Sequence, residues 1–221
     1  MSVDVEAVAQ RLELVRARIQ GACRAGSHRH VDIVAVTKSF GPDAYRAAAQ
    51  VGLTKVGENY AQELVAKHAE LPAGVELHFI GQLQTNKVRS IASYVDVYES
   101  VDRPSLAAEI ARRAPGAAVL VQVDTSAEPG KGGCAPGEVP ALVDQCRGLG
   151  LEVRGLMTVG PTTGGPEAAR PGFRQVRELV DRLGLAECSM GMSDDLEVAV
   201  EEGSTEVRVG SALFGSRPTR A

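Results

Sequence analysis

Lys38 lies at a position where its side-chain amine could act as a nucleophile. Lys38 follows the apolar run 33–36 (IVAV), so we expect its side chain at the end of a buried strand. An amine that is partly removed from water is easier to keep neutral, because burial disfavours the charged form. A neutral amine attacks aldehydes and forms Schiff bases. The same position also fits a rim lysine whose apolar stem lies on the fold while its ammonium group reaches solvent.

Two short turns have the composition of a phosphate site. They are Gly191-Met192-Ser193 and Gly210-Ser211, and each stands just before a helical segment. Backbone N–H groups and hydroxyls at such a position suit a dianionic phosphate. Glycine is also favoured in tight strand-to-helix turns for packing alone. The glycines by themselves therefore leave both interpretations open.

Arg208 is a charged residue within an apolar segment. Because side chains alternate along a strand, Val207 and Val209 share one face and Arg208 takes the other. An unpaired buried charge is costly, so this guanidinium needs a partner. The partner is either a carboxylate inside the fold or a cofactor.

Other polar residues are weaker candidates. We expect His78 to be a core or rim histidine that is satisfied by the backbone. Asp194 and Asp195 have metal-binding chemistry, but adjacent carboxylates before an apolar segment are more typical of a helix start. No pair of cysteines has metal-ligand spacing, so we expect reduced thiols and no metal centre. The cysteines are Cys23, Cys134, Cys146 and Cys188.

The elements that position these residues alternate between short apolar strands and amphipathic helices. The predicted strands are 33–37, 55–58, 78–81, 96–101, 118–124, 153–159, 188–191 and 206–209. Eight such units favour a closed (β/α)₈ (TIM) barrel over an open sheet, and no G-x-G-x-x-G follows the first strand. In such barrels the functional groups gather at the carboxyl ends of the strands.

Before the first strand, apolar residues recur every three or four positions from Val5 to Ile19, which predicts an extra N-terminal helix. Gly21 and Gly26 are expected at its end. The segment 161–171, rich in Gly, Pro and Thr, is expected to be a mobile loop. We predict that residues 1–221 form a single barrel domain.

The composition excludes several classes of partner. The chain has 24 Lys and Arg against 28 Asp and Glu, a net charge of −4, and no basic run, so no nucleic-acid partner is expected. A run of ~18 apolar residues, as a membrane span requires, is absent from the sequence. The N-terminus also lacks an apolar signal core, so we expect a cytoplasmic protein.

Six segments together resemble the pyridoxal 5′-phosphate (PLP) homeostasis proteins of the YggS/PROSC type. The resemblance covers nearly the whole chain, and it favours the Schiff-base interpretation of Lys38. The matching segments are 35–38 (AVTK), 57–63 (GENYAQE), 78–87 (HFIGQLQTNK), 155–158 (GLMT), 189–195 (SMGMSDD) and 207–215 (VRVGSALFG).

The resemblance implies a fold similar to the barrel domains of alanine racemase and eukaryotic ornithine decarboxylase. It also implies a PLP site with a role for each of seven residues. They are Lys38 for the Schiff base, Asn59 beside the ring, Arg208 near the ring nitrogen, Gly210 and Ser211 in the phosphate turn, and Ser193 and Ser189 assisting there. Ser211 stands where threonine is common in the family, which keeps a hydroxyl.

The resemblance implies storage and delivery of PLP, in transient contact with PLP-dependent apoenzymes, without efficient catalysis. An arginine at the ring nitrogen leaves that nitrogen unprotonated, which weakens the electron sink. The second domain that supplies alanine racemase with its second base is not expected here, and its loss favours a monomer.

Two rival functions remain. A weak racemase or decarboxylase would need a catalytic residue such as Tyr60 or Cys134 near the cofactor. A barrel that binds another phosphorylated metabolite would use Lys38 only as a point charge.

Overall fold

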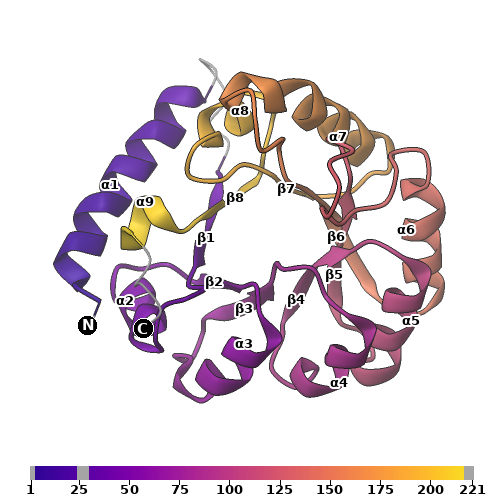
Figure 1. Cartoon of the computed structure of the whole chain (residues 1–221), viewed down its shortest axis with the longest axis horizontal. Helices are drawn as coiled ribbons and strands as arrows, with labels where there is room; N and C mark the ends of the chain where they lie inside the picture. The colour runs from indigo at the N-terminus through magenta and orange to yellow at the C-terminus, as the bar shows by residue number, and fades with distance from the viewer. Residues whose placement is uncertain (1–2, 24–29, 217–221) are drawn as a thin grey trace.

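The strands close into the barrel that the sequence predicts. The computed structural model describes residues 3–23 and 30–216. Within them, eight parallel strands pair in chain order from β1 to β8, and β8 pairs back onto β1. Figure 1 looks along the barrel, with the strands at the centre and the helices in a ring around them. The predicted (β/α)₈ architecture is confirmed.

The strand bounds differ from the predicted ones by at most two residues. β3 begins earlier than predicted, because its first residue, Glu76, is polar and breaks the apolar pattern. The strands are β1 Asp32–Val36, β2 Lys55–Glu58, β3 Glu76–Phe79, β4 Val97–Val101, β5 Ala118–Val123, β6 Glu152–Thr158, β7 Glu187–Ser189 and β8 Glu206–Val209.

The predicted N-terminal helix is α1, Val5–Ala22, and Asp4 caps it by accepting hydrogen bonds from two amides of its first turn. It packs along α8 and α9 on the outside of the barrel. Gly26 lies outside the described residues.

The remaining helices are α2 Asp43–Gln50, α3 Ala61–Lys67, α4 Val88–Ile91, α5 Pro104–Arg113, α6 Val139–Gly148, α7 Arg170–Arg182, α8 Leu196–Glu201 and α9 Ser211–Phe214, with 3₁₀ turns η1 His68–Glu70, η2 Thr85–Lys87 and η3 Pro166–Ala169.

The prediction of a loop over residues 161–171 is wrong for the second half of that segment. Its second half contains η3 and the start of α7, and Pro171 lies in the first turn of α7. A proline is tolerated there because the N–H it lacks would have no helical partner. The Gly and Pro content that suggested a loop therefore marks a helix start.

The core has two parts. The larger part fills the space between the strands and the surrounding helices. The smaller part lies inside the barrel and consists of Val97, Ala118, Leu120 and Met157, with Val159 packed against it. Polar side chains occupy much of the remaining barrel interior, among them Glu99, Ser189 and Arg208. Buried polar groups need partners, so this interior must be a connected network.

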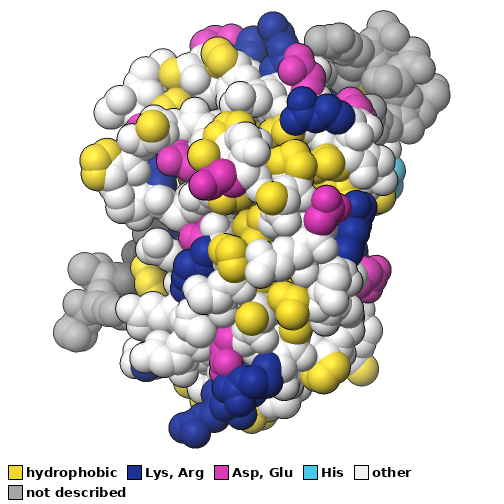
Figure 2. Space-filling model, turned by 90° about the vertical axis from the view of Figure 1, so that its right-hand side faces the viewer, with side chains coloured by type: hydrophobic (Ala, Val, Ile, Leu, Met, Phe, Trp, Pro, Cys, Tyr) yellow, Lys and Arg dark blue, Asp and Glu magenta, His cyan; other side chains and the backbone are white. Residues whose placement is uncertain are grey.

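The surface carries charges of both signs. On the face shown in Figure 2, acidic and basic side chains are interspersed with apolar ones, and no continuous basic stripe crosses it. Within the described ranges, no helix combines the length and apolar character that crossing a bilayer requires.

Candidate functional site

Three of the predicted site residues follow neighbouring strands. β1 lies between β8 and β2, with Ala35 paired to Val209 and Val36 to Gly57. Lys38 and Asn59 thus follow the carboxyl ends of two paired strands, and paired strands lie about 4.8 Å apart. Gly210 lies against the end of β1 as well, because a Cβ added to it would be 3.3 Å from the carbonyl oxygen of Val36.

The turn that carries Lys38 is held from outside the barrel by α3. Ser39, the next residue, has a φ of 69°, a conformation that few non-glycine residues adopt. Its amide donates a hydrogen bond to the Glu63 carboxylate at 2.8 Å. This contact offsets part of the strain and fixes the backbone beside Lys38.

A buried ion pair supports the same turn. The Lys67 ammonium donates to the carbonyl oxygens of Thr37 (3.0 Å) and Phe40 (3.1 Å), and it lies 2.5 Å from the Glu58 carboxylate. The same Glu58 oxygen accepts hydrogen bonds from the hydroxyls of Thr37 (2.6 Å) and Tyr45 (3.1 Å). Burial raises the pKa of Glu58, while Lys67 and the two hydroxyls oppose that rise. We call Glu58, Lys67, Thr37 and Tyr45 the clamp.

On the β2 side, one buried polar atom of the predicted site lacks a protein partner. The side-chain oxygen of Asn59 is buried and has no hydrogen-bond partner within the described structure. Its backbone is fixed by Gly81, since a Cβ at that position would lie 2.1 Å from the Asn59 carbonyl oxygen. An unpaired buried amide oxygen is costly, so a polar ligand at this position would be stabilising.

Arg208 points into the barrel, as the alternation predicts, and only 4% of its surface is exposed. Its two terminal nitrogens donate to the Ser189 hydroxyl and to the Thr158 carbonyl oxygen, both at 2.7 Å. The Ser189 hydroxyl in turn donates to Glu99 at 2.7 Å. The internal carboxylate of Glu99 therefore does partner Arg208, through the hydroxyl of Ser189.

Ser189 lies deeper than the phosphate turn to which the resemblance assigns it. Its side chain is fully buried between Arg208 and Glu99, so both of its hydrogen-bonding directions are used within the barrel. This placement corrects the expected role: Ser189 is placed to hold Arg208 rather than a phosphate group.

The turns after β7 and β8 do lie side by side. The Ser193 hydroxyl accepts a hydrogen bond from the amide of Ala212, at 3.3 Å, and Ser211 is exposed next to it. Asp195 stands at the N-cap position of α8, as the helix-start interpretation of the acidic pair expects. Its carboxylate accepts from the amide of Met192, before the helix, at 2.6 Å and makes no capping bond to the helix itself. Ser193, Gly210 and Ser211 thus border one small polar patch.

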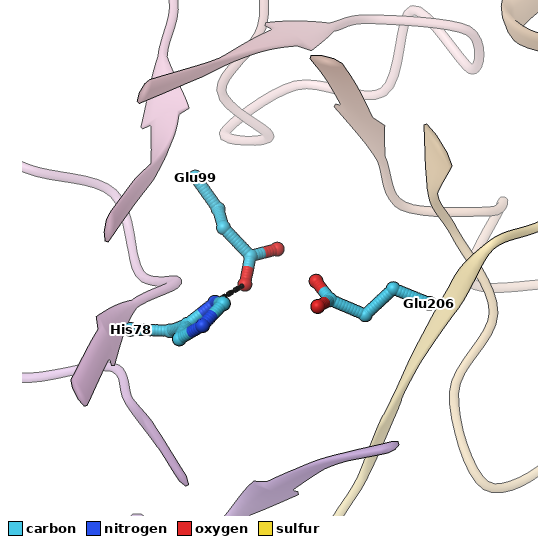
Figure 3. Close-up of side chains that lie close together, drawn as sticks. All are labelled: His78, Glu99 and Glu206. Atoms are coloured by element: carbon cyan, nitrogen blue, oxygen red, sulfur yellow. Dashed lines mark hydrogen bonds and ion pairs between the residues drawn. The ribbon is translucent and has the colours of Figure 1, made fainter. Parts of the chain in front are cut away.

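One buried cluster has no counterpart in the sequence analysis. His78, Glu99 and Glu206 point toward one another inside the barrel, from β3, β4 and β8 (Figure 3). His78 Nδ1 lies 2.7 Å from Glu99, so the expectation of a backbone-satisfied histidine is wrong. Burial alone would lower the pKa of His78, but the carboxylates of Glu76 and Glu99 outweigh it and raise the pKa to about 10.

The chain is similar to proteins of known name over nearly its whole length. The alanine racemase N-terminal domain family matches residues 3–218. The pyridoxal phosphate homeostasis protein of Pseudomonas aeruginosa is 41% identical over 220 residues, which cover 95% of this chain and 96% of that protein.

Among solved structures, PipY of Synechococcus elongatus with PLP bound is 34% identical, with a TM-score of 0.80, over 94% of this chain and 100% of that one. An alanine racemase of Clostridium difficile shares the fold at 13% identity and a TM-score of 0.76, over 99% of this chain and 58% of that one.

The fold and the matches define a barrel of the alanine racemase N-terminal domain class. Within that class, the chain belongs to the family of pyridoxal phosphate homeostasis proteins.

Proposed function

We propose that this protein binds PLP, holds it as a Schiff base on Lys38, and serves intracellular PLP homeostasis by storing and delivering the cofactor. One observation carries the proposal. Lys38, Asn59, Arg208 and Gly210 come from three adjacent strands and stand at or near their carboxyl ends, where barrels of this kind build their sites. PipY, which is 34% identical to this chain, was solved with PLP bound.

The residues of the site fit the chemical groups of PLP. Lys38 would supply the amine for the aldehyde, and the Asn59 oxygen, which lacks a protein partner, could accept a hydrogen bond from a polar group of the ligand. Arg208 would donate to the ring nitrogen, and the patch formed by Ser193, Gly210 and Ser211 would receive the phosphate. PLP supplies an electron sink when bound, and a permanently cationic donor at its ring nitrogen weakens that sink.

The proposal extends to how the protein works in the cell. Residues 1–221 act as one domain, as a monomer in the cytoplasm, and meet PLP-dependent apoenzymes only transiently. The closed barrel supports the single domain, because all eight strands belong to one sheet.

The alternative is a weak amino-acid racemase or decarboxylase. Its two candidate catalytic residues have poor properties for that role. Tyr60 is 53% exposed, and Cys134 is buried, which raises the pKa of its thiol to about 11. A thiol with so high a pKa is almost fully protonated at neutral pH and is a poor base.

Absorbance spectroscopy separates these functions. With added PLP, the wild type is expected to show a Schiff-base band that Lys38→Ala lacks, while Lys87→Ala keeps it. D- and L-amino acids are then added and followed by chiral chromatography. A band without turnover supports the carrier function, steady turnover supports the enzyme, and a wild type without a band contradicts the PLP assignment.

A further inference from the structure

Arg208 is the end of a hydrogen-bonded chain that runs into the barrel. Arg208 donates to Ser189, and Ser189 donates to Glu99. His78 Nδ1 lies 2.7 Å from the other Glu99 oxygen, and the raised pKa of His78 together with the lowered pKa of Glu99 makes His78 the donor there. A serine hydroxyl has one proton, so it can accept from Arg208 only while that proton points to the carboxylate. Glu99 is therefore an acceptor toward Ser189, and its lowered pKa, caused by His78 and Arg208, favours the ionised form that also accepts from His78.

Burial makes this chain rigid and strongly coupled. Glu99 and Ser189 are fully buried, and His78 and Arg208 are at most 4% exposed. Burial tends to raise the pKa of Glu99, but His78 and Arg208 hold it below its usual range. In such surroundings charges interact more strongly than in water, so the charge of Glu99 acts on the guanidinium 4.0 Å away.

Other charged groups face the same interior, and they already pair with one another. Glu206 lies 2.8 Å from the Lys55 ammonium, which also contacts Asp32 at 2.7 Å. Burial and the neighbouring Glu99 raise the pKa of Glu206 to about 7. The remaining groups near His78 and Lys55 are Glu76, Arg154 and Glu187.

These pairings decide between two interpretations of the cluster. His78, Glu99 and Glu206 have the ligand types of a divalent cation site. A metal would have to displace the proton of His78 and compete with Lys55 for Glu206. His78 and Lys55 already pair with the two carboxylates, so the chain to Arg208 is complete with protein partners alone.

We infer that Glu99, held by His78, is a positioning residue that fixes Arg208 through Ser189 and thereby sets the electrostatic field at the cofactor. The inference rests on the proposed function. Glu99 offsets part of the positive charge that Arg208 presents to the PLP ring. Without that offset, a protonated Schiff base on Lys38 becomes less favourable.

The perturbation is Glu99→Gln, which keeps the size of the side chain and removes its charge. We expect the pH midpoint of the Schiff-base absorbance to fall by about one pH unit, the order of shift that a single nearby charge commonly causes in a protein. PLP should also bind more weakly, by several-fold, because Arg208 is less well held.

Two further variants separate positioning from a general loss of structure. Ser189→Ala interrupts the chain with one small neutral change but keeps the charge of Glu99, so it should weaken PLP binding several-fold while it shifts the midpoint less than Glu99→Gln does. Glu76→Gln removes a carboxylate that contacts the other side of His78, 3.7 Å away, but is not part of the chain to Arg208. Since Glu76 acts on the midpoint only through His78, Glu76→Gln should shift the midpoint less than Glu99→Gln does.

The outcomes distinguish this inference from the proposed function. A wild type without a Schiff-base band contradicts the function itself. If Glu99→Gln has the wild-type midpoint and Ser189→Ala binds PLP as tightly as the wild type, the inference alone is overturned. In the cofactor-free protein, NMR should find His78 protonated at pH 8 in the wild type but neutral in Glu99→Gln. A stoichiometric divalent metal in purified wild type, lost in Glu99→Gln, would also overturn it.

Discussion

Replacing Lys67 by methionine tests whether the clamp supports the turn that carries Lys38. The substitution keeps the length of the side chain but removes the ammonium that contacts Glu58, Thr37 and Phe40. Glu58 is left fully buried with two hydroxyl donors and no cation. An uncompensated buried charge of this kind costs about 3–5 kcal/mol of folding free energy.

For a chain of this size, that loss corresponds to a fall in the melting temperature of roughly 6–20 °C. Calorimetry and urea unfolding measure it directly. Lys87→Met serves as the control, because Lys87 is partly exposed and has no ion pair among those found, so its effect should stay within about 0.5 kcal/mol.

A second variant separates stability from positioning. Adding Glu58→Gln to Lys67→Met removes the stranded charge and should restore a large part of the stability. The carbonyl groups of Thr37 and Phe40 stay unsupported, so PLP affinity should remain below that of the wild type. If Lys67→Met unfolds within about 1 kcal/mol of the wild type, Lys67 and Glu58 do not form the buried pair described here.

Three further predictions concern other parts of the site. Gly81→Ala places a methyl group on the Asn59 backbone, 2.1 Å from its carbonyl oxygen, so it should lower both stability and PLP affinity, whereas Gly137→Ala, with nothing within 4 Å, should be neutral by both measures. Because the pKa of His78 is raised to about 10, its contribution to the free energy of unfolding is complete below about pH 6.5 and is lost as the pH rises toward 10. Urea unfolding should therefore show that the wild type loses more unfolding free energy over this pH range than His78→Gln does. Ser193→Ala and Ser211→Ala should each weaken binding of PLP more than binding of pyridoxal, which lacks the phosphate; equal losses for both ligands would contradict the phosphate assignment.

The sequence predicts the barrel well because its signal is local and repeated. Each strand is a short apolar run, and eight runs at βα spacing favour one architecture. Arg208 was predictable for a similar reason: a charged residue that alternates with Val207 and Val209 must face the opposite side. The depth of Ser189, the partner of His78 and the helical part of 161–171 were misjudged.

The supporting residues were harder to predict, because their partners are distant in the sequence. His78 meets Glu99, and Glu99 meets Ser189, only once strands β3, β4 and β7 close into one barrel. Glu58 and Lys67 carry no local sign that they will be buried together, since charged residues are most often exposed. A charged residue inside an otherwise buried strand is the available signal, and Glu58 and Glu99 both fit it.

The central claim is that Lys38 forms the Schiff base, and chemical trapping tests it most directly. The purified protein is mixed with PLP, reduced with borohydride, digested, and analysed by mass spectrometry. Reduction converts a Schiff base into a stable secondary amine, so the modified lysine is identified by its peptide. The account predicts one phosphopyridoxyl group per chain, on Lys38, and none on that peptide without reduction. Modification spread over the surface lysines, or placed on another lysine alone, would contradict it.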